Sequence, residues 1–187
     1  IAGNIDRSHW AASHGWTNGS IQSCEWRADA VKAEKQGVSL WLNKKGGRIH
    51  PLGCAELQSK KNTFHYGRYE ARLKTAAGSG LNTAFFTYAG PQMGSKHHDE
   101  IDFEFLGKDP TSVQLNYHVK GDGKHVKMVS LGFDASKAFH TYRFDWHPDK
   151  IEWFVDNKKV HATKPGAKMP VLPGKIIFML WSGSEEA

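Results

Sequence analysis

The sequence has no long apolar run and almost no cysteine. Of its 187 residues only 39% are hydrophobic, and no stretch approaches the roughly 18 apolar residues that a membrane-spanning helix needs. No charged-then-apolar leader precedes Ile1, so we expect a chain that has been processed or trimmed. Cys24 and Cys54 alone cannot supply a four-ligand zinc site, and neither belongs to a CxxC redox motif. These absences exclude a membrane-spanning protein and a thioredoxin-like redox site.

The two cysteines leave two alternatives open. A disulfide would close a loop of about 31 residues, would contribute roughly 3.5 kcal/mol, and requires an oxidising compartment. Otherwise both are buried free thiols of a cytosolic protein.

Charge of one sign is in modest excess. Lys and Arg number 25 against 19 Asp and Glu, which gives +6 with histidine neutral and favours an anionic partner. The basic residues are scattered in ones and twos, however, and form neither a basic helix nor an RNA-binding signature. We therefore expect no nucleic-acid partner.

Alternation of apolar and polar residues, and not helical spacing, dominates the chain. Within His140–Trp146 the aromatic side chains share one face, and Ile151–Val155 alternates in the same way after a Pro148-Asp149 turn. The same signal predicts seven further strands: 39–42, 66–75, 82–88, 100–106, 113–119, 126–131 and 175–181. With no repeat, linker or amphipathic helix, the sequence predicts one all-β domain, an antiparallel sandwich.

The most informative segment carries three carboxylates with a period of two. Glu100, Asp102 and Glu104 would project from one face of a strand, because the alternating residues Ile101, Phe103 and Phe105 mark the opposite face as the core. A row of like charges is unfavourable unless something uses it, since each carboxylate raises the pKa of the next. Glycoside hydrolysis uses such a row, because it needs one protonated and one ionised carboxyl group.

Two other interpretations of this strand stay open. It could be a solvent-exposed acidic strand, or a cation site built from His97, His98 and the acids. The neighbouring segment 114–118 favours the sugar-binding interpretation, because its outward row offers hydrogen-bonding groups, and aromatic residues suited to stacking on sugar rings are abundant. An H-x-E triplet starts at His98, but the P-C-x-x-C partner of zinc deaminases is absent.

Three segments resemble the bacterial lichenase-like endo-β-glucanases of glycoside hydrolase family 16. They are FFTYAGP (85–91), DEIDFEFLGKD (99–109) and SLGFDASKAFHTYRFDW (130–146). The resemblance implies a concanavalin-like antiparallel β-jelly-roll sandwich with a substrate cleft on its concave face. It also implies a retaining mechanism with Glu100 as nucleophile, Glu104 as acid/base and Asp102 as their modulator.

Further residues carry over from this resemblance position by position. It implies a disulfide between Cys24 and Cys54. The expected substrate-binding residues, including positions where this chain departs from the family, are Trp16, Asn18, Glu56, Gln58, Phe86, Tyr88, His98, Asn116, His118 and Trp181.

Four cleft positions depart from the lichenase pattern. This chain has Gln58, His98, His118 and Met179 at positions where the lichenases have Arg, Trp, Tyr and Asn, respectively. With the basic charge balance, these changes make the chain similar to the rhizobial endoglycanases that depolymerise succinoglycan, an acidic exopolysaccharide. We therefore expect a succinoglycan-type substrate, with neutral mixed-linkage glucan (lichenan) as the alternative and a non-catalytic carbohydrate-binding sandwich as the alternative of another class.

The resemblance sets the remaining expectations. Family members have strands before the position of Ile1 and beyond Ala187, so residues 1–187 are expected to form one catalytic domain without its terminal strands. We expect a secreted monomer, extracellular or periplasmic, that needs no cofactor. The family's structural calcium site uses a C-terminal residue, and the sequence does not decide whether this chain has it.

Overall fold

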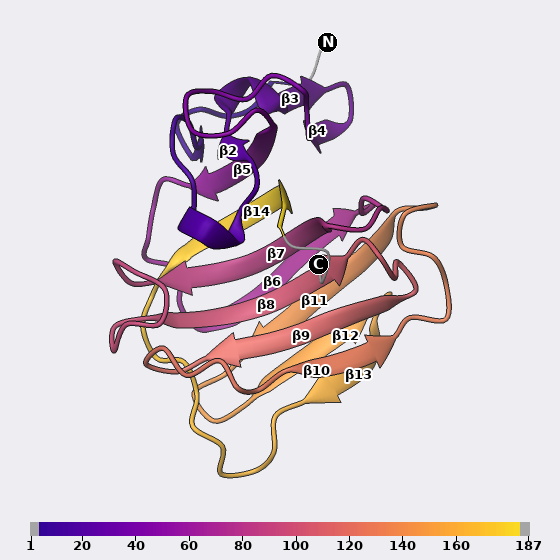
Figure 1. The fold of residues 1–187 in the computed structure, drawn as a ribbon. Helices are drawn as coiled ribbons and strands as arrows, with labels where there is room; N and C mark the ends of the chain where they lie inside the picture. The colour runs from indigo at the N-terminus through magenta and orange to yellow at the C-terminus, as the bar shows by residue number, and fades with distance from the viewer. Residues whose placement is uncertain (1–3, 184–187) are drawn as a thin grey trace.

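Two facing β-sheets form the body of the protein (Figure 1). The computed structural model describes residues 4–183. The larger sheet has the strand order β1-β5-β14-β7-β8-β9-β10, and β2 pairs with β5 in parallel. Its strands are β1 (Trp10–Ala12), β2 (Glu25–Trp26), β5 (Gly53–Ser59), β7 (Leu81–Ala89), β8 (Asp99–Leu106), β9 (Ser112–His118), β10 (Lys127–Ser130) and β14 (Lys175–Ser182).

The smaller sheet lies behind the larger one in Figure 1 and has the order β13-β12-β11-β6. Its strands are β6 (Gly67–Leu73), β11 (His140–Trp146), β12 (Ile151–Val155) and β13 (Lys158–Ala162). A separate hairpin is made of β3 (Val31–Glu34) and β4 (Gly37–Leu40). Helix in the described residues is limited to two short 3-10 turns, η1 (Gly19–Ile21) and η2 (Ala28–Ala30), so no helix there has the length and apolar character for crossing a bilayer.

The main core fills the space between the two sheets. Every second residue of β8 contributes to it, and Ile101, Phe103 and Phe105 are at most 1% exposed. Across the gap, Tyr142 and Phe144 of β11 pack on these rings, with centroid distances of 5.7 Å and 6.4 Å from Phe103. Burial of such a side chain contributes about 1.5–3 kcal/mol, so the core determines which face of β8 points inward.

The predicted all-β antiparallel sandwich is confirmed, and all nine predicted strands are present. Five strands were not predicted, namely β1, β2, β3, β5 and β13. The seven residues of β5 are almost all buried, because one face packs on Ala30 and Val31 while the other faces the cleft described below. Burial on both faces removes the alternation that would have revealed this strand.

A disulfide joins Cys24 to Cys54, so the free-thiol alternative is wrong. Beside it, the Gln22 side-chain amide donates to the Cys24 carbonyl at 2.8 Å and accepts from the Asn18 backbone N–H at 3.0 Å. The bridge therefore anchors the loop that carries Trp16 and Asn18 to strand β5.

Candidate active site

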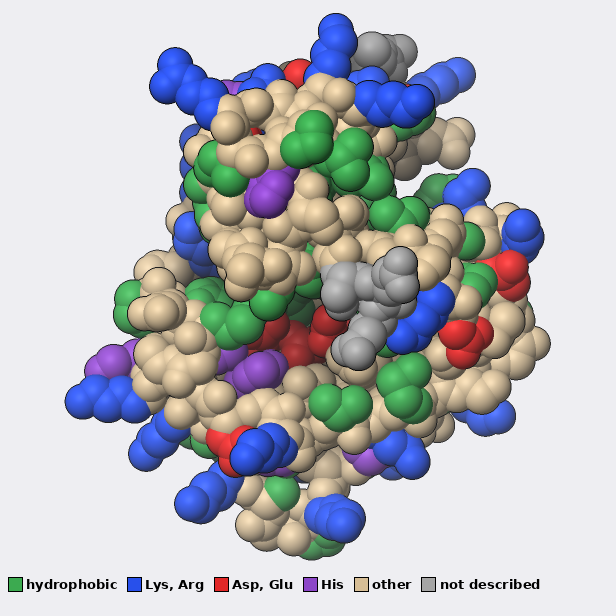
Figure 2. All heavy atoms as spheres, in the orientation of Figure 1, with side chains coloured by type: hydrophobic (Ala, Val, Ile, Leu, Met, Phe, Trp, Pro, Cys, Tyr) green, Lys and Arg blue, Asp and Glu red, His purple; other side chains and the backbone are tan. Residues whose placement is uncertain are grey.

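Strand β8 presents its three carboxylates on the face away from the core, as predicted. Glu100, Asp102 and Glu104 all line a cleft of about 800 Å³ on the outer face of the larger sheet. Figure 2 shows acidic side chains at the bottom of a hollow, with histidine beside them. The exposed-strand alternative is wrong, because Asp102 is only 1% exposed.

Each carboxylate has a polar neighbour on β9, which is also as predicted. The antiparallel register places Glu100 opposite His118, Asp102 opposite Asn116 and Glu104 opposite Gln114. Directly opposed residues of neighbouring strands share one face of the sheet. The two strands therefore form a polar floor across the cleft.

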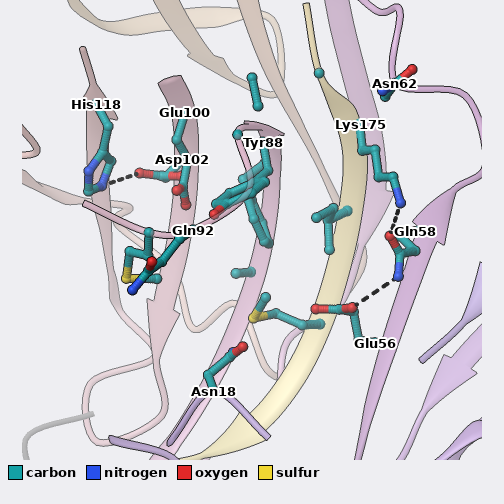
Figure 3. Close-up of a pocket in the computed structure, with 18 of the residues that line it drawn as sticks. Asn18, Glu56, Gln58, Asn62, Tyr88, Gln92, Glu100, Asp102, His118 and Lys175 are labelled. Carbon is teal, nitrogen blue, oxygen red and sulfur yellow. Dashed lines mark hydrogen bonds and ion pairs between the residues drawn. The ribbon is translucent and has the colours of Figure 1, made fainter. Parts of the chain in front are cut away.

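Twelve of the thirteen predicted catalytic and substrate-binding residues line this cleft. Figure 3 shows several of them, together with three polar residues that the sequence did not single out: Asn62, Gln92 and Lys175. The twelve are Trp16, Asn18, Glu56, Gln58, Phe86, Tyr88, Glu100, Asp102, Glu104, Asn116, His118 and Trp181.

Glu104 is held by two amide donors. Asn82 Nδ2 donates to Oε2 and Gln114 Nε2 donates to Oε1, each at 2.9 Å. Burial raises the pKa of Glu104, the amide bonds partly oppose the rise, and the nearby charge of Glu100 adds to it. A carboxyl group in this environment is suited to hold a proton and deliver it to a leaving oxygen.

Asp102 is the most deeply buried of the three acids. Among the described residues no amide, hydroxyl or basic group donates to either carboxyl oxygen, the nearest basic nitrogen being His118 Nε2, 3.8 Å from Oδ2, and the hydrogen-bond partner of the carboxyl group is the Glu100 carboxyl group. Burial, followed by the charge of Glu100, raises the pKa of Asp102 well above its usual value. The carboxyl group between the two glutamates therefore stays neutral to higher pH than an exposed aspartate, which reduces the repulsion between the three carboxyl groups.

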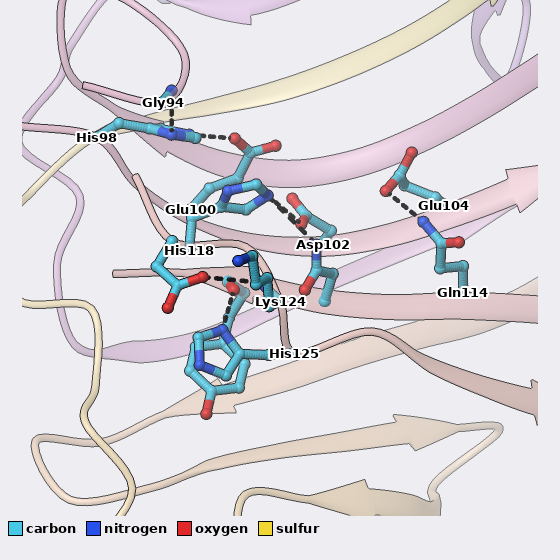
Figure 4. Close-up of polar contacts among 12 residues, drawn as sticks. Gly94, His98, Glu100, Asp102, Glu104, Gln114, His118, Lys124 and His125 are labelled. Atoms are coloured by element: carbon cyan, nitrogen blue, oxygen red, sulfur yellow. Dashed lines mark hydrogen bonds and ion pairs between the residues drawn. The ribbon is translucent and has the colours of Figure 1, made fainter. Parts of the chain in front are cut away.

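His98 does not line the cleft, and the expectation that it contacts substrate is wrong. The side chain is 0% exposed, because the turn before β8 folds it beneath the Tyr88 and His118 rings, with centroids 5.0 Å and 4.6 Å away. Its Nε2 lies 2.5 Å from Glu100 Oε2 (Figure 4). The predicted pair of cleft histidines is therefore reduced to His118.

His118 lies at the edge of the cleft and is partly buried. Burial is the main cause that lowers its pKa, and the charge of Glu100 opposes this. A Cβ atom on Gly123 would lie 2.1 Å from the imidazole Cε1, so only glycine at that position leaves room for the ring. His118 is thus a mainly neutral, tightly packed group at neutral pH.

On the other wall of the cleft, a row of hydrogen-bonded polar side chains runs from β14 to β5. Lys175 Nζ donates to Gln58 Oε1 at 2.6 Å, and Gln58 Nε2 lies 3.5 Å from Glu56 Oε1 (Figure 3). Burial raises the pKa of Glu56, while Ser13 and the charge of Lys175 oppose the rise. Lys175 could have been predicted as a cleft residue from the sequence, because it alternates with Met179 and Trp181 and so lies on the same face of the strand.

Within residues 4–183, one group of ligand atoms could hold a metal ion. Nitrogen atoms of His98 and His118 and a carboxylate oxygen of Glu100 all lie within 4.8 Å of one another. Of the predicted cation site this group keeps His98 and Glu100 and adds His118, whereas His97 is exposed on the preceding turn. The calcium site that the resemblance suggested depends on a C-terminal residue and lies outside the described residues.

Comparison with known proteins identifies the family. The protein-family model described as glycosyl hydrolases family 16 matches residues 18–187 of this chain. The chain belongs to glycosyl hydrolase family 16. Its fold agrees with the predicted jelly roll, since a solved Bacillus licheniformis β-glucanase superposes with a TM-score of 0.88 at 42% identity, covering 97% of this chain and 82% of that one.

Curated relatives of this family 16 chain span most of its length. A β-glucanase from Paenibacillus macerans is 46% identical over 180 residues, which cover 96% of this chain and 74% of the relative. The endo-1,3-1,4-β-glycanase ExoK of Rhizobium meliloti is 41% identical over 177 residues, 95% of this chain and 65% of that protein.

The raised pKa of Asp102 predicts that Asp102→Asn stabilises this family 16 domain at neutral pH. The folded protein keeps the proton at pH values where the unfolded chain, with a pKa of 3.8, has lost it, so wild-type stability falls as pH rises above 3.8. In urea unfolding, the variant should have a larger free energy of unfolding than wild type at pH 7, and the difference between the two should become smaller as the pH falls toward 3.8. A margin that is independent of pH would contradict the assignment.

Asp109→Asn is the control of opposite sign. Side-chain hydrogen bonds from Thr111 and Ser112 lower the pKa of the exposed Asp109. Its ionised form therefore stabilises the fold above pH 3.8, and that contribution is lost as pH falls. This variant should be less stable than wild type at pH 7.

Proposed function

We propose that the protein is a retaining endo-1,3-1,4-β-glucanase that hydrolyses neutral mixed-linkage β-glucan. The observation that carries the proposal is the row of Glu100, Asp102 and Glu104 on one face of β8, at the floor of an open cleft. Two carboxyl groups flanking a third that stays neutral supply the acid and the nucleophile of a double displacement.

The first displacement uses both glutamates. Glu104 donates its proton to the glycosidic oxygen while the Glu100 carboxylate attacks the anomeric carbon, so that the glycosidic bond breaks and a covalent glycosyl-enzyme forms. The amide bonds from Asn82 and Gln114 fix the orientation of Glu104 for this transfer.

The second displacement reverses the roles. Glu104, now ionised, takes a proton from water as the water oxygen attacks the anomeric carbon, and Glu100 leaves as a carboxylate. Asp102 lies between the two glutamates, and the part of its interaction that comes from the Glu100 charge is lost in the glycosyl-enzyme and returns when Glu100 leaves. The product keeps the β-configuration.

The cleft walls suit a neutral sugar chain. Trp16 is 42% exposed and, with Tyr88 and Trp181, offers ring faces for stacking on pyranose rings. Asn18 and Asn116 offer amide groups for hydroxyls. The disulfide that anchors the Trp16 loop also supports secretion into an oxidising compartment.

Mixed-linkage glucan is better supported than the succinoglycan-type substrate expected from the sequence. The relatives at 41–46% identity carry the name β-glucanase, and even the rhizobial one is named an endo-1,3-1,4-β-glycanase. The charge argument for an acidic glycan weakens as well, since His98 is buried and the Lys175 ammonium is bonded to Gln58.

Replacing either glutamate should abolish turnover without unfolding the protein. We expect Glu100→Gln and Glu104→Gln each to reduce kcat on lichenan by about 10³-fold or more, because each removes a chemical step. Glu70→Gln, on the exposed side of β6, is the matched control and should keep wild-type activity. Activity within tenfold of wild type for either cleft variant would contradict the roles of the glutamates, and a wild-type protein that binds lichenan without cleaving it would favour a non-catalytic sugar-binding domain.

A substrate panel tests the specificity. The initial rate of reducing-sugar release should be highest on lichenan, and at least about tenfold lower on laminarin and on succinoglycan at equal mass concentration, a discrimination that corresponds to about 1.4 kcal/mol. A higher rate on succinoglycan would instead support the acidic exopolysaccharide.

A further inference from the structure

His98 makes a hydrogen bond to Glu100 from a position where the lichenase pattern has a tryptophan. Its Nε2 lies 2.5 Å from Oε2 of Glu100, and the imidazole is completely buried. Glu100 itself reaches the cleft. His98 thus stands behind the proposed nucleophile, on the side away from substrate.

The other ring nitrogen shows which nitrogen carries the proton. The Gly94 backbone N–H donates to His98 Nδ1 at 3.0 Å, so Nδ1 is an acceptor and has no hydrogen (Figure 4). In a neutral imidazole the single proton is then on Nε2, which makes Nε2 the donor to Glu100.

The backbone around His98 holds this arrangement in place. The His98 N–H donates to the Ser95 carbonyl at 2.9 Å, and the His98 carbonyl accepts from the Gly121 N–H at 2.8 Å. A Cβ on Gly121 would lie 2.4 Å from the Gly94 oxygen, and one on Gly90 would lie 2.4 Å from the His97 oxygen. These close approaches leave the turn little freedom to move its N–H groups.

We propose that His98 is a positioning residue for catalysis, an Nε2–H donor that holds the Glu100 carboxylate in its attacking orientation. The proposal rests on the proposed role of Glu100 as nucleophile. A hydrogen bond to an ionised carboxylate favours the charged form and fixes the rotamer, both of which a nucleophile needs before substrate arrives.

The same atoms suggest a competing role as metal ligands, which the tautomer disfavours. A metal on Nε2 would move the proton to Nδ1, where it would oppose the Gly94 N–H. The other titratable groups near the ring are Glu100 on β8, His118 on β9 and Tyr88 on β7. Burial raises the pKa of Tyr88 and lowers that of His118, so neither adds a charge next to His98 at neutral pH.

Two isosteric variants separate the two hydrogen bonds of the ring. His98→Asn can still accept from Gly94 but cannot reach Glu100, whereas His98→Gln places an amide donor near the Nε2 position. The exposed neighbour provides the control, His97→Asn. The substrate is a 2,4-dinitrophenyl β-glucan oligosaccharide, whose leaving group needs no proton, so kcat/KM reports attack by Glu100 and not proton transfer from Glu104.

We expect His98→Asn to lower kcat/KM by about 10- to 100-fold, the loss typical for a hydrogen bond to a charged group. The acidic limb of its pH profile should move to higher pH, while His98→Gln and His97→Asn stay within about threefold of wild type. An unchanged rate and profile for His98→Asn would overturn the proposal. If Glu100→Gln is also active on this substrate, the proposed function fails instead.

A measurement on the wild-type protein keeps the test independent of how the variants fold. ¹⁵N NMR of the wild-type histidine rings at pH 7 should show His98 as the Nε2–H tautomer. An Nδ1–H tautomer or an imidazolium would overturn the proposal. So would inhibition by micromolar Zn²⁺ that His98→Asn abolishes, because Nε2 would then be a metal ligand.

Discussion

The period of two along β8 connects the stability of the fold to its chemistry. Ile101, Phe103 and Phe105 are sealed between the sheets, and Phe103 alone lies within 6.4 Å of four other aromatic rings. A slip of one residue would exchange the two faces and drive three carboxyl groups into the core. Packing on one side of the strand therefore fixes the position of the acids on the other.

The same strand creates the conditions under which the acids differ. Asp102 sits at the middle of the row and loses almost all contact with water, whereas Glu104 keeps two amide donors and Glu100 receives the His98 ring. Three carboxyl groups of similar chemistry thus acquire three environments. Such a separation allows neighbouring acids to take different roles in one reaction.

Much of this was predictable because alternation is a local property. The faces of β8, its pairing with β9 and the strands β11 and β12 follow from residues close together in the chain. Strand β5 escaped prediction because it is buried on both faces, and β13 because lysines occupy its exposed edge. The disulfide was left open by the residues themselves and was implied only by the family resemblance.

The wrong prediction for His98 has a specific physical cause. The family resemblance predicts a cleft position because the lichenases have a tryptophan there. The imidazole of His98 is smaller and its Nδ1 can accept a hydrogen bond, so the ring turns toward the Gly94 N–H and becomes buried. The hydrogen bond from Lys175 to Gln58 joins two strands, and the one from Gly94 to His98 lies within one turn. Neither can be predicted from residue spacing alone. The carboxylates proposed to act in catalysis were therefore predictable from the sequence, whereas the side chains and backbone groups that orient the cleft residues were not.

Chemical rescue with azide tests the division of labour between the two glutamates most directly. With an activated aryl β-glucoside oligosaccharide, Glu100→Ala leaves a space on the α-face, so the account predicts that azide yields the α-glycosyl azide. Glu104→Ala still forms the covalent intermediate on Glu100, and azide should then attack from the opposite face to yield the β-glycosyl azide. The reverse pairing of products with variants would contradict the assignment of Glu100 as nucleophile and Glu104 as acid/base.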